Sequence, residues 1–467
     1  MSRLIVVSNR VNPPTGSGNE SVGGLAMALA AALREYSGIW FGWSGRTAPE
    51  FSGQIQLQKI QGVTVATVDL DEQDVLEYYN GYANKTLWPL FHYRIDLTQY
   101  DRSFGEGYER VNKRFAETLA PLVEAEDLIW IHDYHMIPMA RELRRRGIGN
   151  PIGFFLHIPW PARQLVTTLP RHRRLVESMF EYDLIGFHTE EWAEAFRDYV
   201  VHELGGEVLE DGRVSAFGRS ACVGVFPIGI DAEEFMALGG SEAGLASEQR
   251  MRESLGERRM IVGVDRLDYS KGLEERLAGY EHLLASCPEL RERVFLLQIS
   301  PISRDDVEVY QELRNRLDAL SGRINGEYST VDWVPIRYVN RMYRRDELAG
   351  IYRAAAVGLV TPLRDGMNLV AKEYVAAQNP RDPGVLVLSR FAGAAGQLKD
   401  ALIVNPFSME EVADALKRAL SMEKPERVRR WESLIHNVCT ESVDTWRDRY
   451  VERLKQVRVT APDDHDA

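Results

Sequence analysis

Short apolar runs alternate along most of the chain with segments whose apolar residues recur at helical spacing. In the first half, such runs predict buried strands at Leu4–Val7, Ile39–Trp43, Val63–Val68, Leu128–His132, Ile152–His157 and Leu184–His188, with a helix over Tyr108–Val123. In the second half they predict strands at Met260–Val264, Val294–Ile299, Ala356–Val360, Val385–Leu388 and Leu402–Val404. This alternation predicts an α/β protein with two doubly wound, Rossmann-like domains facing a ligand cleft.

The boundaries between these domains follow from the stretches that break the alternation. Residues Gly205–Val225 are expected to form short β structure outside the α/β alternation. Residues Ile228–Gly244, which contain two adjacent glycines, are expected to form a linker. We expect an N-terminal domain over residues 1–235 and a C-terminal domain over 236–440. Residues 441–467 should form an amphipathic helix and a disordered tail; the helix could pack back on the N-terminal domain. Its apolar stripe comprises Val443, Trp446, Tyr450, Leu454 and Val457.

The segment Val360–Gln378 predicts a strand, a turn and a helix, with a helix N-terminus at the carboxyl end of a buried strand. Unpaired N–H groups and the helix dipole favour an anion there, against Asn368 and Leu369. Asp365 and Glu373 lie two helical turns apart, a spacing that suits the sugar and ribose hydroxyls of a nucleotide sugar. An alternative is that Asp365 caps the helix and Glu373 is a solvated surface residue.

Two further segments predict anion binding. Arg266 and Lys271 follow a predicted strand and can together grip a pyrophosphate, although either could be a surface charge. Gly23 and Gly24 begin a predicted helix, where backbone N–H groups can approach a phosphate, or where the glycines serve helix packing. Arg304 begins another predicted helix, and a cation at that end hints at a compensating anion.

Composition and charge narrow the function class. The formal net charge of -13 argues against binding of nucleic acids or anionic membranes. Three scattered cysteines suit a reducing cytoplasm, and no apolar run approaches the roughly 18 residues of a membrane span. No metal site is predicted: we expect the acids of Asp69–Asp71 to cap a helix, and His132 and His135 have no third ligand.

Ordered motifs along nearly the whole chain resemble the trehalose-6-phosphate synthase family, retaining glycosyltransferases of the two-domain B fold. They are Val6–Arg10, Gly23–Ala26, Trp40–Trp43, Tyr78–Asn80, Leu87–Pro89, Trp130–His135, Phe155–Pro159, Arg266–Lys271 and Val360–Gln378. The resemblance implies metal-independent transfer of glucose from a nucleotide donor, usually UDP-glucose, to glucose 6-phosphate, with retention and without a cofactor. Small molecules are then the expected partners, and homo-oligomerisation stays open.

Site residues follow from the same resemblance, motif by motif. The implied donor-binding residues are Gly23, Gly24, Arg266, Lys271, Asp365, Asn368, Leu369 and Glu373. The implied acceptor-binding residues are Arg10, Trp40, Tyr79, Trp88, Asp133 and Arg304. The implied catalytic residues are Asp133, His157, Arg266, Lys271 and Asp365. Without the resemblance, the tryptophans, Tyr79 and His157 would be interpreted as packed core residues, and Asp133 as a cap.

Two departures from the family pattern, Arg46 and Trp160, fall near the implied acceptor side. These departures concern the acceptor, so a synthase using another phosphorylated acceptor, such as glycerol 3-phosphate, is one alternative. A sugar-phosphate-binding regulator without catalysis is another. It should have lost one of the catalytic residues, whereas Arg266, Lys271, Asp365 and His157 are all present.

Overall fold

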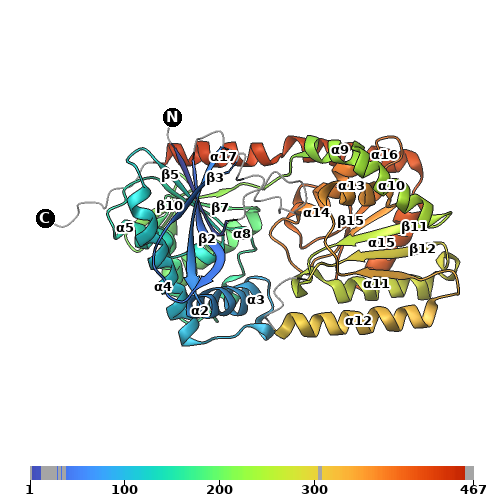
Figure 1. The fold of residues 1–467 in the computed structure, drawn as a ribbon, viewed down its shortest axis with the longest axis horizontal. Helices are drawn as coiled ribbons and strands as arrows, with labels where there is room; N and C mark the ends of the chain where they lie inside the picture. The colour runs from blue at the N-terminus through green and yellow to red at the C-terminus, as the bar shows by residue number, and fades with distance from the viewer. Residues whose placement is uncertain are drawn as a thin grey trace. The chain divides into compact units, whose positions relative to one another are not determined.

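The computed structural model describes residues 3–11, 29, 33, 38–60, 62–302 and 308–457. The chain divides into two compact units (Figure 1). Unit 1 comprises Met1–Ile228 with Asp444–Ala467, and unit 2 comprises Gly229–Val443. The tail expected after the last helix lies outside the described residues from 458 onward.

Unit 1 is built on a ten-stranded sheet whose centre is parallel. In spatial order its strands are β3 (Gln56–Ile60), β4 (Val63–Asp71), β2 (Ile39–Ala48), β1 (Leu4–Arg10), β5 (Leu128–His132), β6 (Ile152–Phe155), β7 (Leu184–Phe187), β10 (Arg219–Val225), β9 (Val214–Ala216) and β8 (Glu207–Val208). β5, β6 and β7 are buried along their whole length, as strands covered on both faces must be. Antiparallel strands occur only at the edges: β3 on one side, β9 and β8 on the other.

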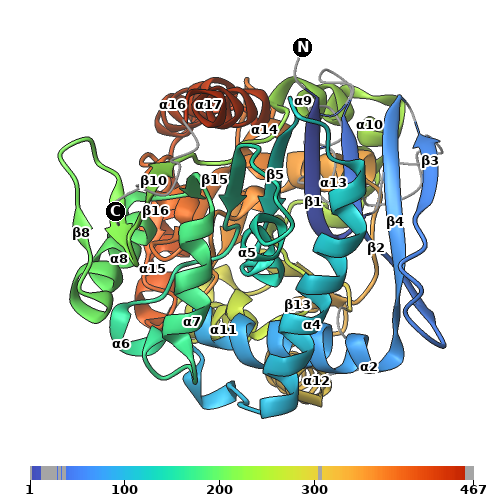
Figure 2. The same cartoon turned by 90° about the vertical axis from the view of Figure 1, so that its left-hand side faces the viewer.

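Helices cover both faces of this sheet (Figure 2). They are α2 (Glu72–Asp74), the π-helical η1 (Val75–Leu87), α3 (Trp88–Phe91), α4 (Arg102–Leu119), α5 (Met139–Arg144), α6 (Arg163–Val166), α7 (His172–Glu177), α8 (Glu190–Tyr199) and α17 (Val443–Gln456). α4 begins earlier than the apolar periodicity predicted, because the Asp101 side chain accepts a hydrogen bond from the Ser103 N–H. Asp71 caps α2 by accepting from the Asp74 N–H at 2.7 Å, which confirms the capping prediction.

The terminal helix α17 belongs to unit 1. Trp446, Tyr450 and Leu454 are at most 2% exposed, and the Tyr450 hydroxyl donates to the carbonyl oxygens of Phe154 and Leu184 at 2.9 and 3.3 Å. The Tyr450 ring lies so close to Gly153 that a Cβ there would approach its hydroxyl to 2.5 Å. The apolar face of α17 is therefore buried against β6 and β7.

Unit 2 contains a six-stranded, fully parallel sheet. Its order is β13 (Ile336–Val339), β12 (Val294–Ile299), β11 (Arg259–Val264), β14 (Val357–Val360), β15 (Val385–Ser389) and β16 (Leu402–Val404). Its helices are α9 (Ala232–Gly240), α10 (Glu242–Leu255), α11 (Leu273–Ser286), α12 (Glu308–Tyr328), α13 (Arg345–Ala354), α14 (Leu369–Ala377), α15 (Met409–Ser421) and α16 (Lys424–Thr440). The two parallel-centred sheets with covering helices confirm the predicted fold class.

Two expectations fail in unit 2. The predicted linker at Ile228–Gly244 is largely helical, because Asp231 caps α9, Ser241 caps α10, and Phe235 is buried against Tyr352. Strand β13 was not predicted at all, since only Ile336 of its four residues is buried and the apolar signal is weak. In the described part of the chain, no helix combines the length and hydropathy of a membrane span.

Candidate functional site

In unit 2, the predicted strand, turn and helix form β14, a loop and α14, and three predicted site residues meet in that loop. The Lys271 ammonium lies 2.5 Å from Asp365 Oδ2, and Asn368 Nδ2 donates to the same oxygen at 3.1 Å. Asp365 is fixed by its own backbone, which pairs with the Phe391–Gly393 segment beyond β15. An ammonium, a carboxylate and an amide are thus held together at the carboxyl edge of the sheet.

The helix that follows presents its N-terminus to this loop. Asn368 adopts a left-handed conformation (φ 75°), and its side chain accepts from the Ala371 N–H, which caps α14. The first amides of α14, beginning at Leu369, have no acceptor within the helix, so an anion can bind there. Glu373 lies on the next turns of α14; burial raises the pKa of its carboxyl, and the nearby Arg345 opposes that rise.

The loop that carries Arg266 and Lys271 is locked onto the Asp365 loop. The Leu363 N–H donates to the Ser270 carbonyl at 2.8 Å, and Gly272 has a φ of 62° with the Thr361 carbonyl only 2.4 Å from where a Cβ would stand. Only glycine fits both conditions. The guanidinium of Arg266, whose side chain is 37% exposed, lies 2.9 Å from the buried carboxylate of Asp268. Both predicted phosphate-binding cations are therefore held in place by carboxylates.

Sequence reasoning missed the residue that supports this loop from below. Arg276 of α11 is fully buried and donates to Asp265 Oδ2 at 2.7 Å, Thr361 Oγ1 at 2.9 Å and Gln298 Oε1 at 3.1 Å. Burial raises the pKa of Asp265, and the Arg276 charge opposes that shift. The available signal was an arginine among the apolar positions Leu273, Leu277 and Tyr280 of one helix face.

In unit 1, the ends of β5 and β6 bring Asp133 and His157 together. Asp133 has a φ of 75°, and its Oδ1 accepts from the His157 N–H at 3.2 Å. His157 Nε2 lies 3.0 Å from His132 Nδ1, and its ring centroid is 5.5 Å from that of His188. Burial lowers the pKa of both His132 and His157 well below the usual range, so both rings are neutral at pH 7.

This row of histidines had a sequence signal that was not used. His132, His157 and His188 each end one of the predicted strands, and those strands are neighbours in the sheet. Because the carboxyl ends of parallel strands meet at one edge, their last residues must cluster there.

Aromatic residues surround the end of β1. The Arg10 guanidinium lies 5.8 Å from the centroid of the Trp43 ring, which packs edge-on against Tyr79 at 5.5 Å. Tyr79 in turn stacks on His135 at 6.0 Å. Trp88 begins α3 and is 7% exposed, with its ring 5.6 Å from Tyr134, the residue after Asp133. The structure thus gathers Arg10, Tyr79, Trp88 and Asp133 around neighbouring strand ends.

Two tryptophans near the implied acceptor side are core residues. Trp40 is 2% exposed, and its indole N–H donates to Ser8 Oγ at 2.8 Å. Trp160 is fully buried among Phe91, Phe187 and Phe196. Trp40 therefore packs as it would without the family resemblance, and its expected contact with the acceptor stays a prediction. Arg46, the other departure, is 63% exposed and pairs with Asp69 at 3.6 Å.

Gly23, Gly24 and Arg304 lie outside the described residues. Their expected roles in donor and acceptor binding therefore stay predictions.

Comparisons with known proteins agree with the motif resemblance. A model of glycosyltransferase family 20 matches residues 2–456. The curated trehalose-6-phosphate synthases of Sinorhizobium fredii and Cronobacter sakazakii are 49% and 45% identical to the chain. They match over 448 and 467 residues, which cover 96% and 99% of this chain and 97% of each relative.

Solved structures give the same result. A UDP-forming trehalose-phosphate synthase from Burkholderia xenovorans in complex with glucose-6-phosphate superposes with a TM-score of 0.93 at 48% identity, covering 97% of this chain and all of that one. A structure from E. coli bound with UDP-2-fluoro glucose has a TM-score of 0.94 at 45% identity, covering 98% of this chain and all of that one. The resemblance drawn from the motifs is confirmed, and the chain belongs to glycosyltransferase family 20.

Proposed function

We propose that this protein transfers glucose from UDP-glucose to the anomeric hydroxyl of glucose 6-phosphate and so forms α,α-trehalose 6-phosphate. The observation that carries the proposal is the contact of Lys271 with Asp365 at the N-terminus of α14, in a chain whose family members include UDP-forming trehalose-phosphate synthases. A cation, a sugar-binding carboxylate and free helix amides are the three groups that a nucleotide sugar requires in one place.

Unit 2 supplies the donor site in this proposal. The diphosphate binds Arg266, Lys271 and the amides at Asn368 and Leu369; a contribution from the Gly23 backbone stays the prediction made from the sequence. Asp365 accepts hydroxyls of the glucose, and Glu373 accepts those of the ribose. When the diphosphate arrives, the Lys271 ammonium is shared between it and Asp365, so the loop changes little on binding.

Most of the proposed acceptor residues belong to unit 1. Arg10 binds the 6-phosphate, while Tyr79, Trp88 and Asp133 surround the sugar; Arg304, in the sequence of unit 2, is the second proposed phosphate-binding arginine. His157 is neutral and hydrogen-bonded through its backbone to Asp133, so it orients a sugar hydroxyl without adding charge. Trp40, whose indole N–H donates to Ser8 Oγ, is the further residue proposed to contact the acceptor.

Transfer proceeds with retention and without a covalent enzyme intermediate. The acceptor oxygen attacks the anomeric carbon on the face from which the diphosphate departs. The new C–O bond forms as the bond to phosphate breaks, and the acceptor proton passes to the departing phosphate oxygen. Arg266 and Lys271 offset the charge that develops on the diphosphate, so the proposal includes neither a metal nor another cofactor.

Three free cysteines agree with a reducing, cytoplasmic setting.

A product assay tests the proposal. The purified chain is incubated with UDP-, GDP- and ADP-glucose, each with glucose 6-phosphate or glycerol 3-phosphate, and products are identified by mass spectrometry. The expected product is trehalose 6-phosphate from UDP-glucose and glucose 6-phosphate. A product only with glycerol 3-phosphate would replace the proposed acceptor, and no glucosyl product from any pair would refute the proposal.

A further inference from the structure

Unit 1 contains a second ligand-sized cavity that the proposed reaction does not use. It has a volume of about 310 Å³ and lies between η1, the first half of α4 and the start of α7. Ligand pockets typically measure about 300–1,000 Å³, so a small metabolite fits. None of the predicted site residues lines it. The cavity therefore needs its own explanation.

The walls of this cavity combine aromatic faces with cations. Tyr82 and Tyr108 pack with ring centroids 4.5 Å apart, and Leu169 and Leu175 complete an apolar side. Burial raises the pKa of the Tyr82 hydroxyl, which therefore stays protonated and able to donate a hydrogen bond. A ring, whether of a sugar or of a nucleobase, suits such a surface.

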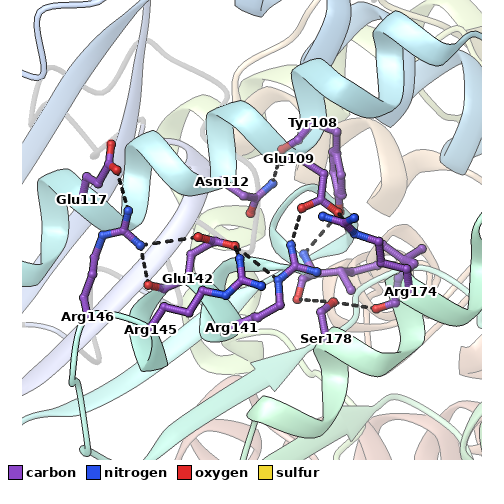
Figure 3. Close-up of polar contacts among 12 residues, drawn as sticks. Tyr108, Glu109, Asn112, Glu117, Arg141, Glu142, Arg145, Arg146, Arg174 and Ser178 are labelled. Carbon is purple, nitrogen blue, oxygen red and sulfur yellow. Dashed lines mark hydrogen bonds and ion pairs between the residues drawn. The ribbon is translucent and has the colours of Figure 1, made fainter.

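Three arginines, Arg102, Arg171 and Arg174, and two acids, Asp101 and Glu109, line the cavity beside this apolar side. Arg102 pairs with Glu106 at 2.7 Å. Arg174 lies 3.4 Å from Glu109, whose carboxylate Arg141 also contacts (Figure 3). Arg171 is exposed, and in the described part of the chain it takes part in no ion pair. Its backbone is left-handed (φ 61°), a conformation that is strained for a non-glycine residue. An exposed arginine that has no ion pair among the described residues, in a strained backbone conformation beside a cavity, indicates an anionic ligand.

A neighbouring hollow shares Glu109 and Arg174 with the cavity, and five of its seven lining residues are basic: Arg110, Lys113, Arg145, Arg146 and Arg174. All five form ion pairs with carboxylates of Asp74, Glu77, Glu109, Glu117 or Glu142. Their charges are therefore largely balanced, and the anion preference of the cavity depends on Arg171.

The cavity wall also touches the segments that carry the acceptor residues. The Tyr108 hydroxyl donates to the Tyr134 carbonyl at 2.6 Å, directly after Asp133. Tyr108 stacks with Tyr78, whose hydroxyl donates to Asn9 Oδ1 at 2.7 Å, directly before Arg10. η1 itself carries both Tyr82 and Tyr79. Tyr82 and Tyr108 are thus connected by direct contacts or by η1 itself to the three segments that carry acceptor residues.

We propose that this cavity is a binding site for a small ring-bearing phosphate ester, with its ring against Tyr82 and Tyr108 and its phosphate at Arg171 and Arg174, and that its occupancy alters use of the acceptor. The binding site stands on the cavity alone. Only the effect on the acceptor rests on the proposed function.

Binding is tested by calorimetry on the full chain with UDP saturating the donor site. The probes are AMP, fructose 6-phosphate and inorganic phosphate. We expect one saturable site for AMP, for fructose 6-phosphate or for both, and the pattern identifies a nucleotide or a sugar phosphate as the source. Absence of binding by both ring probes overturns the site. So does inorganic phosphate binding as tightly as either, because the ring surface would then contribute nothing.

Two variants locate the binding. A Cβ at Gly105 would meet only Tyr82 Cε2, at 3.8 Å, so Gly105→Leu can fill the cavity without a backbone clash and should abolish binding. Arg171→Gly removes the cation and relieves the left-handed backbone, so the fold is kept while affinity falls about 10-fold. Arg381→Ala, an exposed arginine of unit 2, is the control. Unchanged binding in both cavity variants overturns the assignment.

Kinetics test the coupling. With the probe saturating, the KM for glucose 6-phosphate should change by about 5-fold or more, whereas the KM for UDP-glucose stays constant. Arg171→Gly should lose this response and keep its activity without probe. Binding with no change in the glucose 6-phosphate KM overturns the coupling. If the chain forms no trehalose 6-phosphate, calorimetry still decides the site, so failure of the proposed function is distinguishable.

Discussion

The candidate site residues of unit 2 and unit 1 use opposite chemistry at similar places in their folds. At the strand ends of unit 2, Arg266, Lys271 and Arg276 are matched with the carboxylates of Asp268, Asp365 and Asp265. At the strand ends of unit 1, the neutral rings of His132 and His157 and several aromatic side chains predominate. Both sets stand at the carboxyl edge of a parallel sheet.

The difference matches the two tasks in the proposed reaction. A departing diphosphate gains negative charge, so cations already held by carboxylates are effective where it leaves. A sugar acceptor stays uncharged at its reacting hydroxyl, so hydrogen-bonding groups and flat apolar faces suffice there, with Arg10 reserved for the phosphate. Substitutions that remove a charge should therefore cause large losses of stability or turnover in unit 2. In unit 1 they should affect only the use of the phosphorylated acceptor.

The largest effect is expected at the buried support of the unit 2 loop. Arg276→Met leaves the fully buried Asp265 carboxylate without its partner, which should cost about 3–5 kcal/mol in the free energy of unfolding of unit 2. Denaturant titration gives the free energy of unfolding, and differential scanning calorimetry provides a second measurement of the loss. Arg316→Met, which breaks an exposed pair with Glu274, is the control and should cost less than about 1 kcal/mol. Equal losses would contradict a buried-pair effect.

Turnover should depend on the two cations that face the donor phosphates. The double variant Arg266→Ala/Lys271→Ala is expected to lose at least about 100-fold in kcat, because charge on the departing diphosphate is no longer offset. Steady-state rates with UDP-glucose and glucose 6-phosphate measure it, with thermal melting as the check on folding. A near-normal kcat in a folded variant would remove these residues from the mechanism.

In unit 1, the effect of a lost charge should be confined to the phosphorylated acceptor. Arg10→Ala is expected to lower kcat/KM for glucose 6-phosphate by roughly 10- to 100-fold, the scale of one charge-assisted hydrogen bond. Unphosphorylated glucose should be used almost as before. The neighbouring exposed Arg46→Ala serves as the matched control. An equal loss with both acceptors would mean that Arg10 maintains structure.

A smaller effect concerns acid stability. Burial lowers the folded-state pKa of His132 and His157 below the unfolded value, so the unfolded chain binds more protons as the pH falls below about 6.5. Stability is therefore lost on acidification. His132→Gln should reduce the slope of stability against pH by up to about 1.4 kcal/mol per pH unit. Thermal melts from pH 7.5 to 5 test this against the exposed His436→Gln; identical slopes would contradict it.

Removal of metal ions with EDTA is expected to have no effect on turnover. If Arg266 and Lys271 replace a metal in balancing charge, EDTA should leave turnover unchanged. Strong inhibition that magnesium reverses would show that the charge balance involves a metal after all.

Local patterns were enough to predict most central strands and the β14–α14 turn, since both depend on apolar runs and on Pro362, Gly366 and Asn368 close together in sequence. They were insufficient at Ile228–Gly244, where paired glycines suggested a linker but Asp231 and Ser241 cap two helices. Single-sequence patterns do not report which distant side chains will cover a helix.

The site shows the same limit. Lys271, Asp365 and Asn368 follow from motif and spacing, and the structure places them in contact. The apolar neighbours of Arg276 on α11 indicate that it is buried, but its partners Gln298 and Thr361 are distant in the chain, so a local window does not identify them. Trp40 lies in the core, as it is interpreted without the family resemblance.

The position of α17 has a consequence for how the chain is made. Unit 1 begins at the amino terminus, yet its sheet is completed by Trp446 and Tyr450, which are translated after all of unit 2. At about 5–20 residues per second, the ribosome needs on the order of 10–40 seconds to synthesise unit 2. During that interval nascent unit 1 exposes the slot above Gly153 and Gly186. Unit 1 is therefore the first unit to be started and the last to complete its core.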